Sequence, residues 1–183
     1  MSRIGKKVIT IPSGVTLKVA NNKVSVKGPK GELHQAIDPD FTVTQENSLV
    51  TVNRPTEQKR HRALHGLYRA LIANMVEGVS VGYKKQLELV GVGYKVTAQS
   101  NVLELSLGYS HNVFLAVPPE VKVAAMQEKG ANPTIILESA DKQLIGQIAA
   151  KLKSLRKIEP YKGKGIRFSN EYVRRKAGKA AAK

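Results

Sequence analysis

The chain has 183 residues, of which 42% are hydrophobic, and this length suffices for one ordinary domain or two small ones with their own cores. It has no cysteine, which excludes a disulfide framework and a cysteine-ligated zinc site. It has neither a run of about 18 apolar residues nor an apolar segment near its start, so we expect a soluble cytoplasmic protein. Its 30 Lys and Arg residues outnumber 14 Asp and Glu residues, and the resulting net charge of +16 predicts a polyanionic partner.

The positive charge is concentrated at the carboxy-terminal end of the chain. Residues 151–183 hold twelve Lys and Arg residues and only two acids, Glu159 and Glu171, whereas residues 83–150 are neutral overall. A basic arm, residues 1–8, carries three further cations and no acid. This asymmetry favours a localised footprint for phosphate groups over a uniformly solubilising surface. For residues 174–183 taken alone, a solvated basic tail is the alternative.

The first half of the chain predicts strands followed by a helix. Alternating residues 15–19 and 23–27 flank Asn21 and Asn22, which tolerate the positive φ of a two-residue hairpin turn. A second alternating pair lies near residues 41–43 and 49–52. A long helix follows, for which Thr56 is the expected N-cap and Gly78 the expected C-terminal glycine. Its apolar stripe comprises Leu64, Leu67, Tyr68, Leu71 and Met75.

The same order recurs about 80 residues further on. Four alternating segments precede a helix that begins near Asp141 with Ser139 as its expected cap, and Gly66 and Gly146 occupy matching places in the two helices. We therefore predict an α+β protein with two duplicated domains, each an antiparallel sheet packed with one long helix. The domains are residues 1–82 and residues 83–169, and a basic tail, residues 170–183, follows them. The expected strands are residues 94–98, 102–107, 114–117 and 134–138, and the stripe of the second helix is Leu144, Ile145, Ile148, Leu152 and Leu155.

No arrangement of residues predicts catalysis, a cofactor or a metal. Glu57, His61 and His65 are spaced for one helix face, but flanking cations oppose a metal ion, and we interpret the three as a solvated face. The glycines at 91 and 93 lack the third glycine and the crossover of a dinucleotide site. We predict that the protein is not an enzyme.

Residues 159–167, Glu-Pro-Tyr-Lys-Gly-Lys-Gly-Ile-Arg, have the composition of a phosphate-binding loop. Proline ends the preceding basic helix, and glycine would let the backbone approach a nucleic-acid strand. Lys162, Lys164 and Arg167 would supply charged donors, and Tyr161 would stack or pack. A flexible loop without a fixed partner is the alternative.

The run Pro-Tyr-Lys-Gly-Lys-Gly at 160–165 resembles the signature of the bacterial large-subunit ribosomal protein L6 family. The opening residues 2–6, the stretch 86–94, the turn at 107–111 and residues 140–143 are also similar to that family, so the resemblance covers essentially the whole chain. Ile158 stands where the family often has proline, which affects only the stiffness of the loop.

The resemblance implies a duplicated two-domain protein bound to 23S ribosomal RNA near the sarcin-ricin loop, the translation-factor site and the stalk base, beside neighbouring large-subunit proteins. It implies RNA contacts by Tyr161, Lys162, Gly163, Lys164 and Gly165, by Tyr109, Ser110 and His111, and by Arg3 and Lys6. Charge adds Lys153, Arg156, Lys157, Arg167, Arg174, Arg175 and Lys176.

With only 5% aromatic residues, we expect the second domain to read RNA by shape and phosphate position, and the first to act as a spacer or protein-contact surface. No cofactor, membrane or small-molecule substrate is expected. Two rival hypotheses stay open: attachment to an anionic membrane surface, opposed by the lack of an apolar face after Phe168, and nucleic-acid processing, opposed by the sparse carboxylates near the loop.

Overall fold

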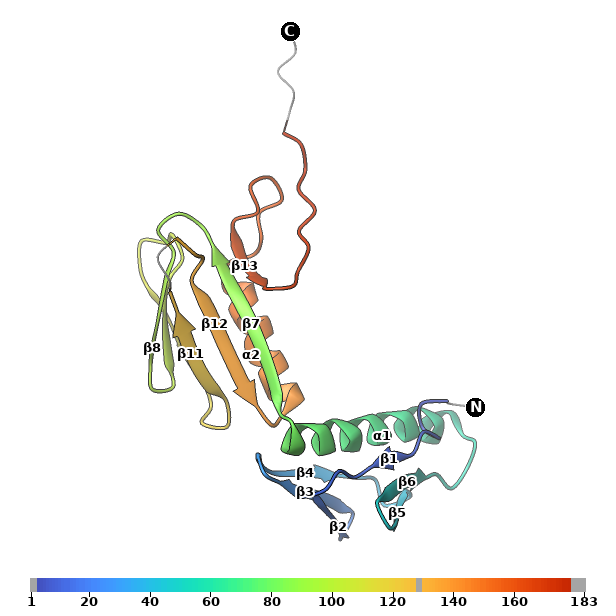
Figure 1. Cartoon of the computed structure of the whole chain (residues 1–183). Coiled ribbons are helices and arrows are strands. Elements are labelled where there is room, and N and C mark those ends of the chain that lie inside the picture. The colour runs from blue at the N-terminus through green and yellow to red at the C-terminus, as the bar shows by residue number, and fades with distance from the viewer. Residues whose placement is uncertain (1–2, 128–129, 179–183) are drawn as a thin grey trace. The chain divides into compact units, whose positions relative to one another are not determined.

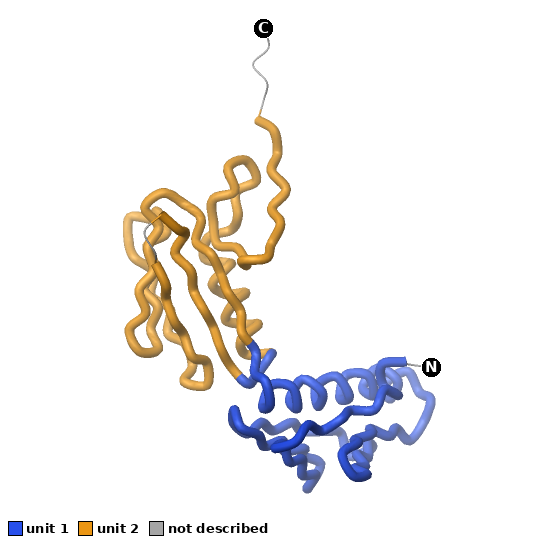
Figure 2. Tube along the Cα trace, in the orientation of Figure 1, with its two compact units in different colours: residues 1–83, 140–142 blue, residues 84–139, 143–183 orange. Residues whose placement is uncertain are grey.

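The computed structural model describes residues 3–127 and 130–178 (Figure 1). The chain divides into two compact units, residues 1–83 with 140–142 and residues 84–139 with 143–183 (Figure 2). Each unit combines antiparallel strands with one helix among the described residues. The predicted α+β class is confirmed.

The first unit contains two three-stranded sheets and helix α1 (Lys59–Ser80). One sheet has the order β2-β3-β4 and the other β1-β6-β5, and every pairing within them is antiparallel. The strands are β1 (Ile9–Thr10), β2 (Thr16–Ala20), β3 (Lys23–Gly28), β4 (Gly31–Ala36), β5 (Thr42–Glu46) and β6 (Leu49–Asn53).

The hairpin between β2 and β3 forms as predicted. Asn21 and Asn22 have φ angles of 48° and 58°, and the flanking Ala20 and Lys23 are directly opposed across the two strands. Two successive positive φ angles give the turn a twist that matches that of the strands. Strands β1 and β4 were not among the predicted segments.

Helix α1 buries a face that overlaps in part with the predicted stripe, because Met75 is buried and Leu64 and Tyr68 pack against the core. Ile72, Met75, Val76 and Val79 belong to the core with the inward residues of the strands, whereas Leu67 is 49% exposed. The predicted stripe was built on the spacing of the leucines. The helix instead presents the side chains that fit against the two sheets.

Both predicted ends of α1 were wrong. Gln58 is the N-cap and makes no side-chain cap bond, while the Thr56 hydroxyl lies 2.7 Å from Nδ1 of His61. The helix continues through Gly78 to the C-cap Val81, and Gly82, at φ +79°, then provides the left-handed conformation that ends a helix.

The two histidines of α1 are buried, so the interpretation of a solvated face was wrong for them. His61 is 7% exposed and donates from Nε2 to the Asp40 carboxylate at 3.2 Å. His65 is 4% exposed and donates from Nε2 to the Val52 carbonyl oxygen at 2.8 Å. His61 has a polar partner at each ring nitrogen, whereas the buried Nδ1 of His65 has no hydrogen-bond partner among the described residues.

The second unit also contains two sheets, with the orders β10-β9-β8 and β11-β12-β7-β13, and helix α2 (Lys142–Leu155). Ile145, Ile148 and Leu152 of the predicted stripe are buried, together with Ala149. Ser139 ends β12 and donates to the Glu120 carbonyl oxygen, so the position before the helix is that of Asp141, not the predicted Ser139. The strands are β7 (Tyr83–Val90), β8 (Lys95–Gln99), β9 (Val102–Ser106), β10 (Val113–Ala116), β11 (Lys122–Met126), β12 (Thr134–Ser139) and β13 (Gly165–Phe168).

The strand orders of the two units correspond. β10-β9-β8 repeats β4-β3-β2, and β11-β12-β7 repeats β5-β6-β1. Strand β13 is an addition in the second unit, where it pairs with the free side of β7. The segment between α2 and β13 is the basic loop singled out from the sequence.

Substitution of alanine for glycine at two positions is expected to change the free energy of unfolding in opposite directions. A Cβ at Gly28 would lie 2.7 Å from the backbone oxygen of Val79, whereas a Cβ at Gly146, inside α2, would come no closer than 3.9 Å to Lys85 Nζ. We expect Gly28→Ala to lower the free energy of unfolding by about 1–3 kcal/mol through overpacking. Gly146→Ala should raise it by about 0.5–1 kcal/mol through helix propensity. Urea denaturation of the full chain measures both, and shifts in the same direction would contradict this packing.

Candidate nucleic-acid interface

The loop of residues 156–165 is held in one conformation by its own backbone. Glu159 N–H donates to the Lys164 carbonyl at 2.8 Å, and Gly163 N–H donates to the Glu159 carbonyl at 3.0 Å. At the base of the loop, Ile166 N–H donates to the Arg156 carbonyl at 3.0 Å. These three hydrogen bonds tie the two sides of the loop together.

The two loop glycines serve the fold of the loop. Gly163 and Gly165 have φ angles of +73° and +141° and are buried. A Cβ on Gly165 would lie 2.7 Å from the Lys157 carbonyl oxygen, and one on Gly163 would lie 3.3 Å from Nε of Arg175. Both glycines therefore leave room for other parts of the same unit, the Lys157 backbone and the Arg175 side chain.

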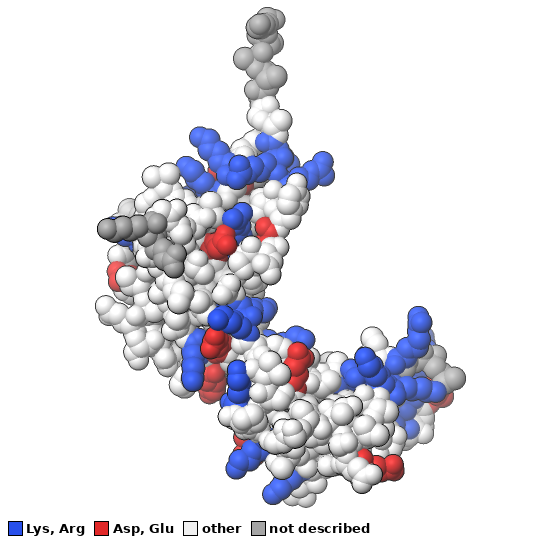
Figure 3. Space-filling model, in the orientation of Figure 1, with Lys and Arg blue, Asp and Glu red and all other residues white. Residues whose placement is uncertain are grey.

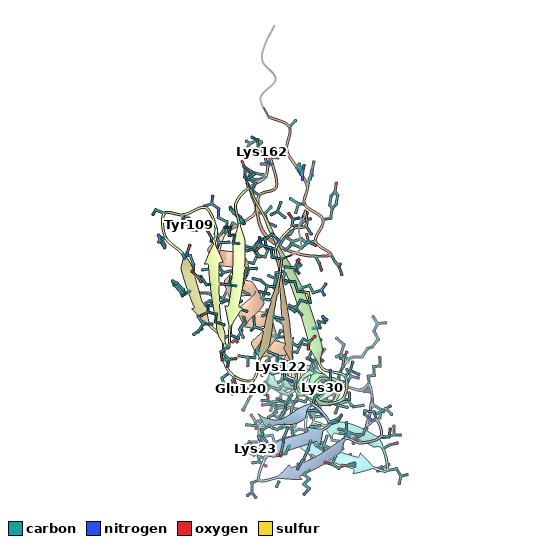
Figure 4. The ribbon with its side chains drawn as sticks, turned by 60° about the vertical axis from the view of Figure 1, so that its left-hand side comes forward. Lys23, Lys30, Tyr109, Glu120, Lys122 and Lys162 are labelled. Carbon is teal, nitrogen blue, oxygen red and sulfur yellow. The ribbon has the colours of Figure 1, made fainter. Side chains whose placement is uncertain are left out.

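Three side chains of the loop project into solvent. Tyr161 is 54% exposed, and Lys162 and Lys164 are exposed as well. Figure 4 shows Lys162 on the loop, far along the unit from Lys122. Lys157, at the foot of the loop, is also exposed. These cations are available to a polyanion.

Arg156 is fixed against two tyrosines. Its guanidinium lies 4.8 Å from the centre of the Tyr109 ring, and its Nε donates to the Tyr94 hydroxyl at 3.1 Å. The hydrogen bond with Tyr109, followed by that with Tyr94, raises the pKa of the Arg156 guanidinium above its ordinary value. Tyr109 in turn donates its hydroxyl to the Leu155 carbonyl at 3.0 Å and stacks on His111, with ring centres 5.9 Å apart. The turn of residues 109–111 is thereby attached to the end of α2.

Two of the predicted contact residues are engaged within the protein. Arg167 donates from Nε and Nη2 to the Glu88 carboxylate at 3.2 and 2.8 Å, across the pairing of β13 with β7. Lys153 donates to both Glu171 oxygens at 2.5 and 2.7 Å and lies 5.3 Å from the centre of the Phe168 ring. The hydrogen bond from Lys153 lowers the pKa of the Glu171 carboxyl. Both cations lie between exposed and buried.

The segment after β13 returns to the loop. Lys176 N–H donates to the Pro160 carbonyl at 2.8 Å, and the side chains of Arg174, Arg175 and Lys176 are exposed. Tyr172 is 91% exposed, and the sequence prediction missed it. The signal that could have found it is an aromatic residue directly before a basic run. The remainder of the tail, residues 179–183, lies outside the described residues.

An open groove of about 690 Å³ lies beside the loop. Figure 3 shows Lys and Arg gathered at the end of the second unit that carries the loop and the segment after β13. Arg3 and Lys6, by contrast, belong to the first unit, where both are exposed. The groove is lined by Tyr109, Ser154, Leu155, Arg156, Lys157, Glu159 and Lys164.

Within residues 3–127 and 130–178, no group of three or more His, Asp or Glu side chains is arranged to hold a metal ion. None of the helices in those ranges has the length and apolar character needed to cross a membrane.

The family model described as ribosomal protein L6 matches residues 11–82 and 90–169. The chain is 65% identical over 184 residues to the large ribosomal subunit protein uL6 of Cytophaga hutchinsonii and 61% identical over 183 residues to that of Parabacteroides distasonis. It is 56% identical to the protein of the same name from Porphyromonas gingivalis. All three matches cover 100% of both chains. This chain therefore belongs to the ribosomal protein L6 family, which is a structural and not an enzymatic family.

Proposed function

We propose that this protein is a structural constituent of the large ribosomal subunit, located in the cytoplasm, and that it binds 23S ribosomal RNA through the basic end of its second unit. The relatives that match over their full length carry the name of a large-subunit protein. A location near the sarcin-ricin loop, the factor-binding region and the stalk base is what the family resemblance implies, with other large-subunit proteins as neighbours.

The observation that carries this proposal is a loop whose cations are exposed while its backbone is fixed. Lys162 and Lys164 extend from a segment closed by three backbone hydrogen bonds. A binding surface that is already ordered loses less conformational entropy when its partner arrives. The loop thus presents the hydrogen-bond donors of two ammonium groups to phosphate oxygens from a fixed backbone.

The contacts of the aromatic side chains support recognition of RNA by its shape and phosphate positions. The Tyr109 ring already contacts Arg156 and His111, so it supports the Arg156 guanidinium instead of stacking on a base. Phosphate contacts position a protein on RNA without reading its sequence. The exposed Tyr161 and Tyr172 are the aromatic side chains of this end that could meet a base or a neighbouring protein.

The first unit has a smaller share of the positive charge, and we propose that it contributes less to RNA binding than the second unit and serves more as a spacer or protein-contact surface. The rival membrane and nuclease hypotheses are separated from ribosomal RNA binding by liposome pelleting and by a metal-dependent nuclease assay. The basic loop itself would attract any polyanion, so these assays test the partner rather than the surface.

Sedimentation of a cell lysate on a sucrose gradient tests the ribosomal role directly. We expect the protein to co-migrate with the large subunit and to resist a high-salt wash in part, because a folded interface adds non-ionic contacts to the salt-sensitive ones. A free peak that salt does not change would contradict the proposal.

Neutralising the loop tests where the RNA binds. We expect Lys162→Gln with Lys164→Gln to weaken binding to ribosomal RNA and to reduce the log-log salt slope by about 0.7–0.9 for each phosphate that the variant no longer neutralises. The matched control is Lys23→Gln with Lys122→Gln, which removes the same charge from exposed strand positions (Figure 4). Equal slopes for the two double variants would exclude the loop as the RNA-binding surface.

Arg167 is expected to position β13 rather than to hold phosphate, because its guanidinium is bonded to Glu88. Arg167→Glu alone should lower the stability of the unit, and adding Glu88→Arg should restore much of it while leaving the net charge of the wild type. If Arg167 only holds β13 against β7, the double variant Arg167→Glu with Glu88→Arg should also recover the wild-type salt slope of RNA binding. Restored stability with a reduced slope would instead make Arg167 a direct phosphate ligand.

A further inference from the structure

A second basic pocket lies in the first unit, where the basic arm crosses the end of β6 and the first half of α1. Its volume is about 380 Å³. The Arg69 side chain fixes the arm there by donating from Nε to the Lys7 carbonyl at 3.0 Å. Gly5 lies against the His65 ring, since a Cβ at that position would come within 2.4 Å of Nδ1. The pocket is lined by Gly5, Lys6, Lys7, Thr51, Val52, Asn53, Arg54 and His65.

Arg54, one of the lining residues, has a guanidinium with one unsatisfied donor. The Arg54 side chain is only 9% exposed, and its Nη2 is paired with Glu57. Nη1 is buried and has no hydrogen-bond partner among the described residues. A buried charged donor without a partner costs free energy, so such an atom calls for a bound ion or water.

The charges around Arg54 favour an anion. Lys6 and Lys7 line the pocket, and no acidic residue is among its lining residues. Glu57, the acidic partner of Arg54, has a side chain that is 69% exposed. Figure 3 shows Lys and Arg gathered at the end of this unit that bears the amino terminus. Arginine with its planar fork is well suited to an oxyanion.

We propose that this pocket binds a phosphate group of an RNA backbone, with Arg54 Nη1 as the central donor and the ammonium groups of Lys6 and Lys7 at its rim. His65 forms part of the wall, held by its bond to the Val52 carbonyl. The site goes beyond the interface proposed for the second unit, and it gives the first unit an RNA-binding site of its own. Because the two sites lie in different units, an experiment can disprove RNA binding at one of them without disproving it at the other.

The test is nuclear magnetic resonance of the full-length chain with ¹⁵N-labelled arginine side chains. Three titrants at constant ionic strength are compared: sodium chloride, inorganic phosphate and a short RNA hairpin. We expect the Arg54 side-chain signals to shift with phosphate and with RNA but not with chloride, while the exposed Arg62 on α1 responds weakly. A response to phosphate without a response to RNA would overturn RNA as the source of the phosphate. No response to either would overturn the site.

Substitution provides the second measurement. Arg54→Gln should reduce the salt slope of binding to 23S ribosomal RNA by about 0.7–0.9, as expected when one fewer phosphate is neutralised, and Arg62→Gln should leave it unchanged. Arg54→Lys keeps the charge and should fold if Arg54→Gln does not, with binding intermediate between wild type and Arg54→Gln. A wild-type slope for a folded Arg54→Gln would overturn the proposal, whatever the loop variants of the second unit show.

Discussion

The pairing of β13 with β7 is the constraint on which the basic end of the second unit depends. Ile166 is fully buried, and Arg167 meets Glu88 across the two strands. Because α2 fixes one end of the loop and β13 fixes the other, the backbone between them follows a defined path. The same strand leads into the segment that returns to Pro160. Loop, turn and carboxy-terminal segment therefore meet at one end of the unit.

The cations of this end divide into two groups with different physical roles. Lys153, Arg156 and Arg167 are partly buried and bonded to carboxylates or tyrosines, so their charges stabilise the fold. Lys162 and Lys164 are exposed to solvent. An exposed charge gains little from a surface ion pair, whereas a partly buried one needs its partner. Net charge alone therefore does not separate the cations that support the fold from those that face solvent.

The two units share a strand order but have become different in their polar parts. In the first unit, buried histidines join α1 to β6 and to the segment before β5, where His65 reaches Val52 and His61 reaches Asp40. In the second unit the helix has an apolar face, and the polar chemistry lies beyond its end, around Arg156. The added strand β13, which pairs with β7, gives the chain after this helix a fixed path.

The amino-acid sequence by itself determined the α+β class, the repeated order of elements, the Asn21–Asn22 turn and the concentration of charge after residue 150. These features depend on local alternation, on tolerance of positive φ and on composition, all of which are readable along the chain. The family resemblance followed from the run at 160–165. The individual site residues stay predictions.

Only the tertiary structure decided which face of α1 is buried, where that helix begins and ends, and which cations have partners. His65 is buried because Val52, 13 residues away, offers its carbonyl, and Arg167 is paired with a carboxylate 79 residues away. Gly82 ends α1 in place of Gly78, although local preference alone allows either. Such choices depend on contacts between segments distant in sequence, whose free energies outweigh the small local preferences that a sequence displays.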